Sequence, residues 1–390
     1  MKNIFMIAYA TYSRDARIRR EAETLASNGY NVSILVPKES PAARKYILSG
    51  VNVIETGRRK YVGKSNPRYM ASYLGFLMIG FAYCARLLAM GRLDVVHVHN
   101  MPNFLVFAAI VPRLFGKKVI LDVHDSMPET FAAKYGTPSG AMFRLFCIEE
   151  KICCLVAHKV ICVNHVQRDT LVKRGIPAEK IEISLNVPDP RWFLKLPADG
   201  NGRGNNSGAL RLVYHGTLAN RLGIDLIIQA VARLRNSIPG IEFHIIGAGD
   251  DSEEYRRLSK AIGVDGNVYF RGPMALESLR DVLKEMDLGI VANRRSAATE
   301  LMLPVKMLEY VELGIPVVAP RLKTIQYYFG ENAVSYFDPE DVDSLAAAVS
   351  RLFSDKARCA RQVEAARESM ENYRWEVHGQ ELLALYKSFN

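Results

Sequence analysis

The chain has 390 residues, which is too long for one ordinary hydrophobic core and predicts two domains of about 150–200 residues each. Hydrophobic residues make up 49% and charged residues 24%, a balance typical of globular proteins that excludes a disordered or low-complexity chain. The net charge is +10, and residues 1–186 hold all of the excess, with 26 Lys and Arg against 14 Asp and Glu. The first half is therefore expected to meet an anionic partner, such as a membrane face, a pyrophosphate-linked acceptor or nucleic acid, although a basic surface without a partner is the alternative.

The cysteines and the N-terminus indicate the compartment. None of the six cysteines forms a CxxC pair or lies near histidines at zinc-finger spacing, so we expect reduced thiols in a cytoplasmic protein. The first residues, MKNIFMIAYA, are a short apolar run that passes directly into charged sequence. We interpret this run as a buried strand and not as a secretory signal.

Apolar runs alternate with helical patterns through the first half. Strands are expected at 4–10, 31–37, 94–100, 118–125 and 159–164. The segment 16–30 (ARIRREAETLASNGY) predicts a helix that ends at Asn28-Gly29. Such alternation is typical of a parallel sheet covered by helices on both faces.

Residues 71–90 are almost wholly apolar and about as long as a bilayer span. Gly75 and Gly80 interrupt the run, Arg86 lies inside it, and two core strands flank it. These features favour a helix buried against the sheet over a spanning helix. Basic and aromatic residues precede the run in RRKYVGKSNPRYM, which also fits a helix that rests at the headgroup level.

The pattern restarts after a segment rich in Pro, Gly and Asn. Residues 187–208 predict a flexible linker between a first domain, 1–186, and a second domain, 209–372. Strands are expected at 211–216, 241–249, 267–272, 287–293, 316–320 and 333–338. Ligands of open α/β sheets bind beyond the carboxyl ends of the strands. Two such domains facing each other would form the active site in the cleft between them.

The stretch LPVKMLEYVELGIPVVAP, 303–320, predicts a helix with a free N-terminus. Pro304 suits the first helical position, and Leu303 at the capping position has no side-chain acceptor for the first N–H groups. Those donors and Lys306 are then available for an anion. Glu309 lies one turn further, roughly 7 Å from the helix start, which suits a carboxylate that binds ribose hydroxyls. An ordinary helix with a Lys–Glu surface pair is the alternative.

This stretch resembles the donor-binding signature of the GT-B glycosyltransferases of family 4. Further blocks of that family occur in the expected order at SRDARIRREAETLASNGYNVSIL, DVVHVHNMPN, DVHDSMPE, YHGTLANRLGIDLII, FHIIGAGDD and NVYFRG. The C-terminal helix, about 373–390, resembles the one that crosses back to the N-terminal domain. The resemblance therefore implies an α/β protein of GT-B fold with two Rossmann-like doubly wound domains.

The resemblance also implies roles for single residues. Glu309 would bind the donor ribose, while Lys306 and the backbone of Leu303, Pro304 and Val305 would bind the diphosphate. Arg221 would stabilise charge on the leaving phosphate. His99 would lie beside the reacting carbon, and we prefer it to His97 because it is nearer the carboxyl end of its strand. The remaining donor-side residues are Gly216 and Phe270–Pro273, which includes Arg271 and would line the base.

Two positions depart from the family pattern. Leu301 stands where the family often has a glutamate that contacts the donor sugar, with Glu300 one place away. Thr217 follows Gly216 where a basic residue is usual, so Arg221 would carry more of the phosphate charge. On the acceptor side the candidates are Arg14, Asp125 and Glu129, of which the two carboxylates are equally well explained as ordinary loop or helix-start residues.

The sequence thus predicts a retaining, metal-independent glycosyltransferase without a cofactor, which uses a nucleotide diphosphate sugar. The basic first half suggests a lipid-pyrophosphate-linked saccharide as acceptor and a cytoplasmic protein peripheral to the anionic inner face of the membrane, active in polysaccharide biosynthesis. A nucleotide-sugar epimerase of GT-B fold is one alternative. A basic nucleic-acid-binding protein is another, but no recognised nucleic-acid motif supports it, so we expect no nucleic-acid partner.

Overall fold

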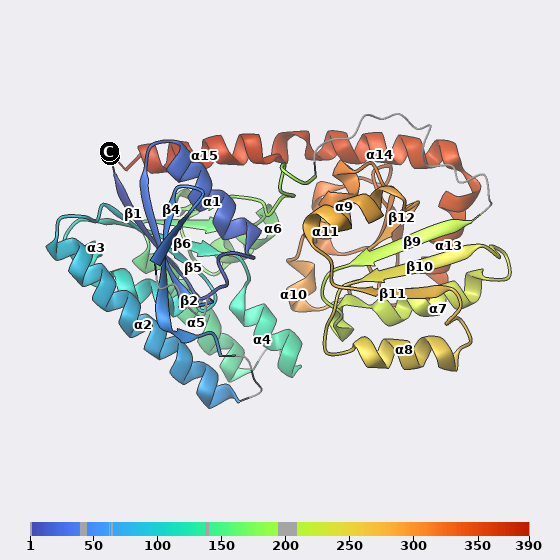
Figure 1. Cartoon of the computed structure of the whole chain (residues 1–390), viewed down its shortest axis with the longest axis horizontal. Helices are drawn as coiled ribbons and strands as arrows, with labels where there is room; N and C mark the ends of the chain where they lie inside the picture. The colour runs from blue at the N-terminus through green and yellow to red at the C-terminus, as the bar shows by residue number, and fades with distance from the viewer. Residues whose placement is uncertain are drawn as a thin grey trace. The chain divides into compact units, whose positions relative to one another are not determined.

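The computed structural model describes residues 2–39, 45–61, 63, 65–136, 140–193 and 209–389. The chain divides into two compact units (Figure 1). Unit 1 comprises Met1–Asn186 and Glu376–Asn390, and unit 2 comprises Val187–Trp375. Each unit is an α/β domain built on its own sheet, which confirms the fold class predicted from the sequence.

Unit 1 contains an eight-stranded sheet in the order β3-β4-β2-β1-β5-β6-β7-β8. Its strands are β1 (Asn3–Ala8), β2 (Asn31–Lys38), β3 (Lys45–Leu48), β4 (Val51–Arg59), β5 (Val95–His99), β6 (Lys118–Val123), β7 (Lys159–Cys162) and β8 (Ile181–Ile183). Neighbouring strands are parallel except β3, which pairs antiparallel with β4. The five predicted strands are present. The edge strands β3 and β8 and the neighbouring β4 were missed because they are short or carry exposed polar residues.

Helices cover both faces of this sheet. They are α1 (Ala16–Ser27), α2 (Asn66–Ala89), η1 (Asn103–Ala109), α3 (Ile110–Leu114), α4 (Met127–Tyr135), α5 (Ala141–Val156), α6 (His165–Lys173), η2 (Ala178–Lys180) and α15 (Trp375–Lys387). One hydrophobic core joins α2, η1 and α5 to the same face of the sheet. Helix α1 begins where the Asp15 carboxylate accepts hydrogen bonds from two first-turn amides, and it ends before Gly29 at a φ of 84°.

Helix α2 corrects the expectation of a helix buried against the sheet. It is continuous through Gly75 and Gly80, and only Phe76, Gly80 and Cys84 are buried. Gly80 permits this contact, because a Cβ there would lie 3.4 Å from both Ala108 Cβ and a methyl group of Ile7. The opposite side of α2 is exposed, with Met78 64% accessible. Gly80 therefore marks close packing, and neither glycine interrupts the helix.

Unit 2 contains a six-stranded parallel sheet in the order β11-β10-β9-β12-β13-β14. Its strands are β9 (Leu210–His215), β10 (Ile241–Ile246), β11 (Val268–Gly272), β12 (Leu288–Ile290), β13 (Val317–Pro320) and β14 (Ser335–Phe337). All six were predicted. The strand order reverses between β9 and β12, and ligands of such sheets bind at this switch point. The loops that follow β9 and β12 are therefore the places to seek a site.

The helices of unit 2 complete the alternation. They are η3 (Asn220–Leu222), α7 (Ile224–Leu234), α8 (Ser252–Ala261), α9 (Leu276–Lys284), α10 (Ala297–Glu300), α11 (Val305–Glu312), α12 (Lys323–Tyr328), α13 (Val342–Ser354), α14 (Lys356–Met370) and η4 (Glu371–Tyr373). Part of the predicted linker is packed, since Val187, Asp189 and Phe193 are buried. Residues 194–208 of that linker lie outside the described residues.

We expect Gly289→Ala to destabilise unit 2. Gly289 lies in β12, and a Cβ there would be 2.3 Å from Cδ2 of Tyr310, whose ring is buried beneath the strand. Such overpacking costs about 1–3 kcal/mol of unfolding free energy. Urea denaturation measures it, with Gly266→Ala as the matched control because a Cβ at Gly266 would meet nothing within 4 Å. Equal midpoints for the two variants would contradict the packing described here.

Candidate functional site

The first group of candidate residues gathers at the end of β9 in unit 2. His215 is the last residue of that strand, and its Nε2 lies 2.5 Å from Oε2 of Glu309. Its Nδ1 lies 3.0 Å from the hydroxyl of Tyr310. Two consecutive residues of α11 thus hold one imidazole, which fixes helix α11 relative to β9. The Glu309 carboxylate is positioned on one oxygen and has Oε1 for a further partner.

Helix α11 begins one residue later than the sequence predicted. The capping residue is Pro304 and not Leu303, and the first helical residue is Val305. The helix start still lacks a side-chain cap, because Pro304 makes no side-chain hydrogen bond to it. The first amides of α11 therefore remain donors for an anion. The helix ends before Gly314, which has a φ of 68°.

Lys306 has no counterion among the described residues. Its Nζ lies 3.7 Å from the centre of the Tyr214 ring and close to Gly216, where an added Cβ would be 3.2 Å away. Within the described residues it makes no hydrogen bond or salt bridge. Burial lowers the pKa of Lys306 to about 7, since Glu309 offsets burial only in part and the Arg221 charge lowers the pKa further. Two neighbouring cations at a helix start favour a bound anion.

The other residues predicted on the donor side have different surroundings in the structure. Gly216 and Arg221 lie exposed in the loop after β9, and Leu303 and Val305 are partly buried beside buried Pro304. Arg271 at the end of β11 donates from Nε to Nδ1 of His244, on the neighbouring strand β10, at 2.9 Å. Glu300 precedes Leu301, the residue that departs from the family pattern. Its two carboxylate oxygens are both engaged, one by Arg295 and the other by the backbone N–H of Lys323.

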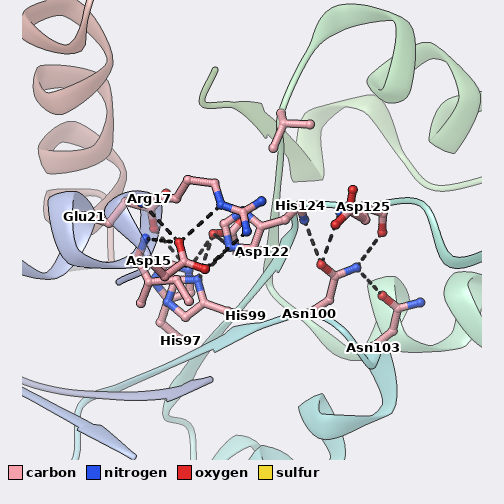
Figure 2. A network of polar contacts seen from close by, with 12 residues as sticks. Asp15, Arg17, Glu21, His97, His99, Asn100, Asn103, Asp122, His124 and Asp125 are labelled. Atoms are coloured by element: carbon pink, nitrogen blue, oxygen red, sulfur yellow. Dashed lines mark hydrogen bonds and ion pairs between the residues drawn. The ribbon is translucent and has the colours of Figure 1, made fainter. Parts of the chain in front are cut away.

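A second polar cluster lies at the carboxyl ends of β5 and β6 in unit 1 (Figure 2). His97 and His99 are on the same face of β5, as predicted, with ring centres 4.3 Å apart. His99 Nδ1 lies 3.0 Å from Oδ2 of Asp122, and His124 Nε2 lies 3.0 Å from the same oxygen. His97 Nδ1 instead contacts the Tyr386 hydroxyl of α15 at 2.8 Å. The two histidines therefore have different surroundings.

The charges of this cluster follow from burial. Burial would raise the pKa of Asp122, but His124 and His99 outweigh it and hold that pKa well below the usual range. Burial lowers the pKa of His99, with Asp122 opposing the effect, and lowers that of His97 further. Neutral His99 then donates from Nδ1 to ionised Asp122, which leaves Nε2 as an acceptor. This tautomer suits a histidine that receives a hydroxyl hydrogen bond.

The acceptor-side predictions separate in the structure. Arg14 is exposed in the turn before α1, and Asp125 is exposed after β6. The Asp125 backbone is held by Asn100, whose Nδ2 donates to the Asp125 carbonyl at 2.7 Å. Glu129 is buried and paired with Arg174. The structure thus groups Asp125 with the β5–β6 cluster and gives Glu129 a partner inside the domain.

One set of side chains has the donor types of a metal site. Single ligand atoms of Glu21, His97, His99 and Asp122 all lie within 4.8 Å of one another in the described chain. Zinc ligands lie about 2.0–2.2 Å from the ion, so this set would have to contract to bind one. Burial, with the Asp122 charge second, raises the pKa of Glu21 well above its usual range, which favours a protonated carboxyl over an ionic ligand.

Sequence reasoning missed His215, Asp122 and His124. Each stands at or directly after the end of a buried strand, which was the available signal. His215 meets Glu309 94 positions away, and Asp122 meets His99 23 positions away, pairings that no local pattern indicates. His124 contacts both Asp122, two positions away, and His99.

Two parallel α/β domains with these polar clusters at their strand ends define a protein of the GT-B class. Residues 16–190 match the family model described as Glycosyltransferase Family 4, and residues 209–355 match that described as Glycosyl transferases group 1. The chain belongs to this family of glycosyltransferases, as its resemblance implied. Sucrose-phosphate synthase from Thermosynechococcus elongatus has the same fold, with a TM-score of 0.79 at 18% identity over 100% of this chain and 99% of that one.

Two curated relatives are similar over part of their length. The amylovoran biosynthesis glycosyltransferase AmsK of Erwinia amylovora is 26% identical over 54% of this chain and 51% of its own. The GDP-mannose-dependent alpha-(1-6)-phosphatidylinositol monomannoside mannosyltransferase of Mycolicibacterium smegmatis is 29% identical over 43% of this chain and 45% of its own. The chain thus spans about half the length of each of these two relatives.

We expect Asp122→Asn to lower the unfolding free energy at pH 7 by about 3 kcal/mol, because it removes the charged partner of two buried histidines. The native pKa of Asp122 is lowered, so its contribution is present above the unfolded value of about 3.9 and is lost as pH falls below it. The difference between parent and variant should therefore narrow in acid. Urea unfolding at several pH values measures this.

Asp125→Asn is the matched control, because Asp125 is exposed on the same segment and its substitution should change stability by less than about 0.5 kcal/mol. Equal losses for the two variants would mean that Asp122 is not the charge on which the cluster depends.

Proposed function

We propose that the chain transfers a sugar from a nucleotide diphosphate sugar to a lipid-linked glycan acceptor, with retained anomeric configuration and without a metal. The observation that supports this most is the start of α11. There, helix amides without a side-chain cap and the Lys306 amine, which pairs with no group in the described part of the chain, lie one turn from the Glu309 carboxylate that His215 holds. An anion followed by a diol is the chemistry of a diphosphate and a ribose.

The charges of unit 2 suit the leaving group. As the glycosidic bond breaks, negative charge accumulates on the diphosphate, and the α11 amides with Lys306 and Arg221 stabilise it. These groups replace the divalent ion that many phosphoryl and glycosyl transfers use. The acceptor hydroxyl attacks from the face that the diphosphate leaves, so no protein nucleophile is required.

The histidine of unit 1 has a separate role in this proposal. Asp122 holds His99 at Nδ1, and the Nε2 atom of His99 is buried without a hydrogen-bond partner among the described residues. In this proposal a hydroxyl of the donor sugar becomes the partner of that nitrogen, which fixes the orientation of the reacting carbon. Asp122 acts as a positioning residue. Leu301 stands where the family often has a glutamate that contacts the donor sugar. Sugar recognition is therefore left to backbone groups, and neither cluster selects the sugar or the base.

The lipid-linked acceptor and the inner membrane face rest on the charge of the first half and on the relatives. The mannosyltransferase of M. smegmatis is named for a GDP-mannose donor and a phosphatidylinositol monomannoside acceptor, and AmsK for polysaccharide biosynthesis. Both fit a basic unit 1 that meets an anionic lipid.

The test is transfer itself. We expect a nucleotide sugar identified by thermal shift to donate its sugar to a lipid extract in the presence of EDTA, and Glu309→Ala to weaken nucleoside diphosphate binding. Loss of a charged hydrogen bond costs about 1.5–3 kcal/mol, or roughly 10–100-fold in Kd. Calorimetry measures the affinity, and NMR of the product gives its anomeric configuration.

Glu277→Ala is the control, since Glu277 is exposed on α9 and should not affect binding. Unchanged affinity in Glu309→Ala would remove the ribose assignment. Epimerisation or hydrolysis of the nucleotide sugar without an acceptor would favour the epimerase instead.

Lys306 makes the binding dependent on pH. A bound diphosphate favours the protonated amine, so affinity should be constant below the free pKa of about 7 and fall by up to about tenfold per pH unit above it. Calorimetric titration with UDP and GDP between pH 6 and 9 measures this. Lys306→Arg keeps its charge throughout and controls for ionisation of the nucleotide. A parent and a variant with the same slope would show that Lys306 does not contact the diphosphate.

A further inference from the structure

Helix α2 presents an apolar row to solvent. Met70, Leu74 and Met78 follow one another at four-residue spacing and are 46%, 48% and 64% exposed. Successive residues at this spacing form one continuous stripe on a helix. The opposite stripe, through Phe76, Gly80 and Cys84, packs on the sheet. By length and composition α2 could cross a membrane, but the packed stripe holds it along the domain surface.

Helix α5 repeats the arrangement. Its outward residues are apolar at spacings of three and four, and each is 40–56% exposed. These residues are Met142, Leu145, Ile148, Ile152 and Leu155. The inward residues Cys153 and Cys154 are buried in the core that also contains Phe76 of α2. Two helices of one layer therefore share a division into a packed side and an exposed apolar side.

The segment between them extends the apolar surface. η1 contacts both α2 and α5, and α3 continues from it. Leu114 and Phe115, at the end of α3, are 77% and 70% exposed. Helices α2, α3 and α5 lie together on the outer side of unit 1 in Figure 1. We call the exposed residues of these three helices the α2–α3–α5 face. Monomeric proteins rarely expose so many large apolar side chains together unless the surface binds a partner.

Most of the charges around this face are basic, and the partly exposed Asp94 is paired with Lys117. From Thr56 to Leu93 the sequence has seven basic residues and no acidic one. On α5 the exposed charges are Arg144 and Lys151, whereas Glu149 accepts from Asn103 and Glu150 is buried. The exposed basic residues that flank or interrupt the face include Arg58, Arg59, Lys60, Arg68, Arg86 and Arg92. An apolar surface with a basic border matches the acyl and phosphate layers of an anionic bilayer.

A second copy of the chain fits less well. A symmetric dimer through this face would place each basic border against its own counterpart, and like charges at an interface oppose association. A bilayer offers both apolar chains and negative charge without that conflict.

We propose that the α2–α3–α5 face inserts into the interfacial region of an anionic lipid bilayer, with α2 and α5 parallel to the membrane plane. This deepens the proposed function, on whose lipid-linked acceptor it rests, because it names the surface by which unit 1 reaches such an acceptor. The binding is apolar as well as electrostatic. It therefore survives salt that screens a purely basic patch.

The test is co-sedimentation of the full chain with vesicles of phosphatidylcholine containing phosphatidylglycerol. The parent should bind, and a substantial fraction should remain bound in 0.5 M NaCl, at which screening is nearly complete within a few ångströms. Leu74→Glu with Met78→Glu, and separately Leu145→Glu with Ile148→Glu, should each weaken binding by at least about tenfold. Since these side chains are exposed, the variants should keep the parent unfolding temperature.

Leu276→Glu is the matched control, because Leu276 is 40% exposed but belongs to unit 2. It should bind vesicles as the parent does. No vesicle binding by the parent, or binding lost entirely in 0.5 M NaCl, overturns the inference. So does a parent that is dimeric by light scattering and becomes monomeric in both double variants with its vesicle binding unchanged.

Nucleoside diphosphate affinity, measured on the same samples, separates this inference from the proposed function. Double variants that lose vesicles but bind UDP or GDP as the parent does support the surface. A parent that binds vesicles but no nucleoside diphosphate would refute the function and leave the surface standing. A parent that binds nucleoside diphosphate but no vesicles would refute the membrane-binding surface and leave the function standing.

Discussion

Every candidate residue depends on one constraint, which is that neighbouring parallel strands end at the same edge of a sheet. In unit 2 the strand order reverses beside β9, and the residue that ends β9, His215, meets Glu309 and Tyr310 of α11. In unit 1 the order reverses beside β1, and the ends of β5 and β6 bring His99 and Asp122 to 3.0 Å. The backbone arrangement thus creates polar clusters from residues that are far apart in sequence.

The two clusters differ in how their charged groups are paired. In unit 1 the Oδ2 atom of the ionised Asp122 lies 3.0 Å from a ring nitrogen of His99 and 3.0 Å from one of His124. In unit 2 Lys306 and Arg221 are neighbouring positive charges that form no salt bridge within the described residues, and burial lowers the pKa of Lys306 to about 7. The hydrogen bond to Asp122 holds the His99 ring in place, whereas two neighbouring positive charges at a helix start favour a bound anion. The proposed roles, orientation for the first cluster and anion binding for the second, rest on this difference.

The helix layer of unit 1 adds a third kind of surface. α2 and α5 each pack one stripe of side chains in the core beside the sheet and expose another stripe that is also apolar. A globular domain gains nothing in water from the second stripe, since exposed apolar area is unfavourable. Its basic border gives the stripe a consistent environment in a bilayer, and this connects the charge excess of residues 1–186 with specific side chains.

The sequence by itself determined the alternation of strands and helices, the free start of the α11 helix and the family of the chain. These are local properties: a buried parallel strand is a continuous apolar run, a proline before a helix removes a cap, and ordered blocks identify a family. It also placed His97 and His99 on one face of a strand, because side chains alternate along it.

Only the tertiary structure decided which of these groups meet. No spacing predicts that His215 holds Glu309, that Asp122 holds His99, or that Glu129 is paired with Arg174 inside the domain. Likewise, the apolar run of 71–90 does not indicate whether its helix is buried on all sides or on one side. The packing of Gly80 against Ile7 and Ala108 shows which side faces outward. Local sequence fixes the conformation of each element, but contacts between elements depend on register and packing across the whole domain.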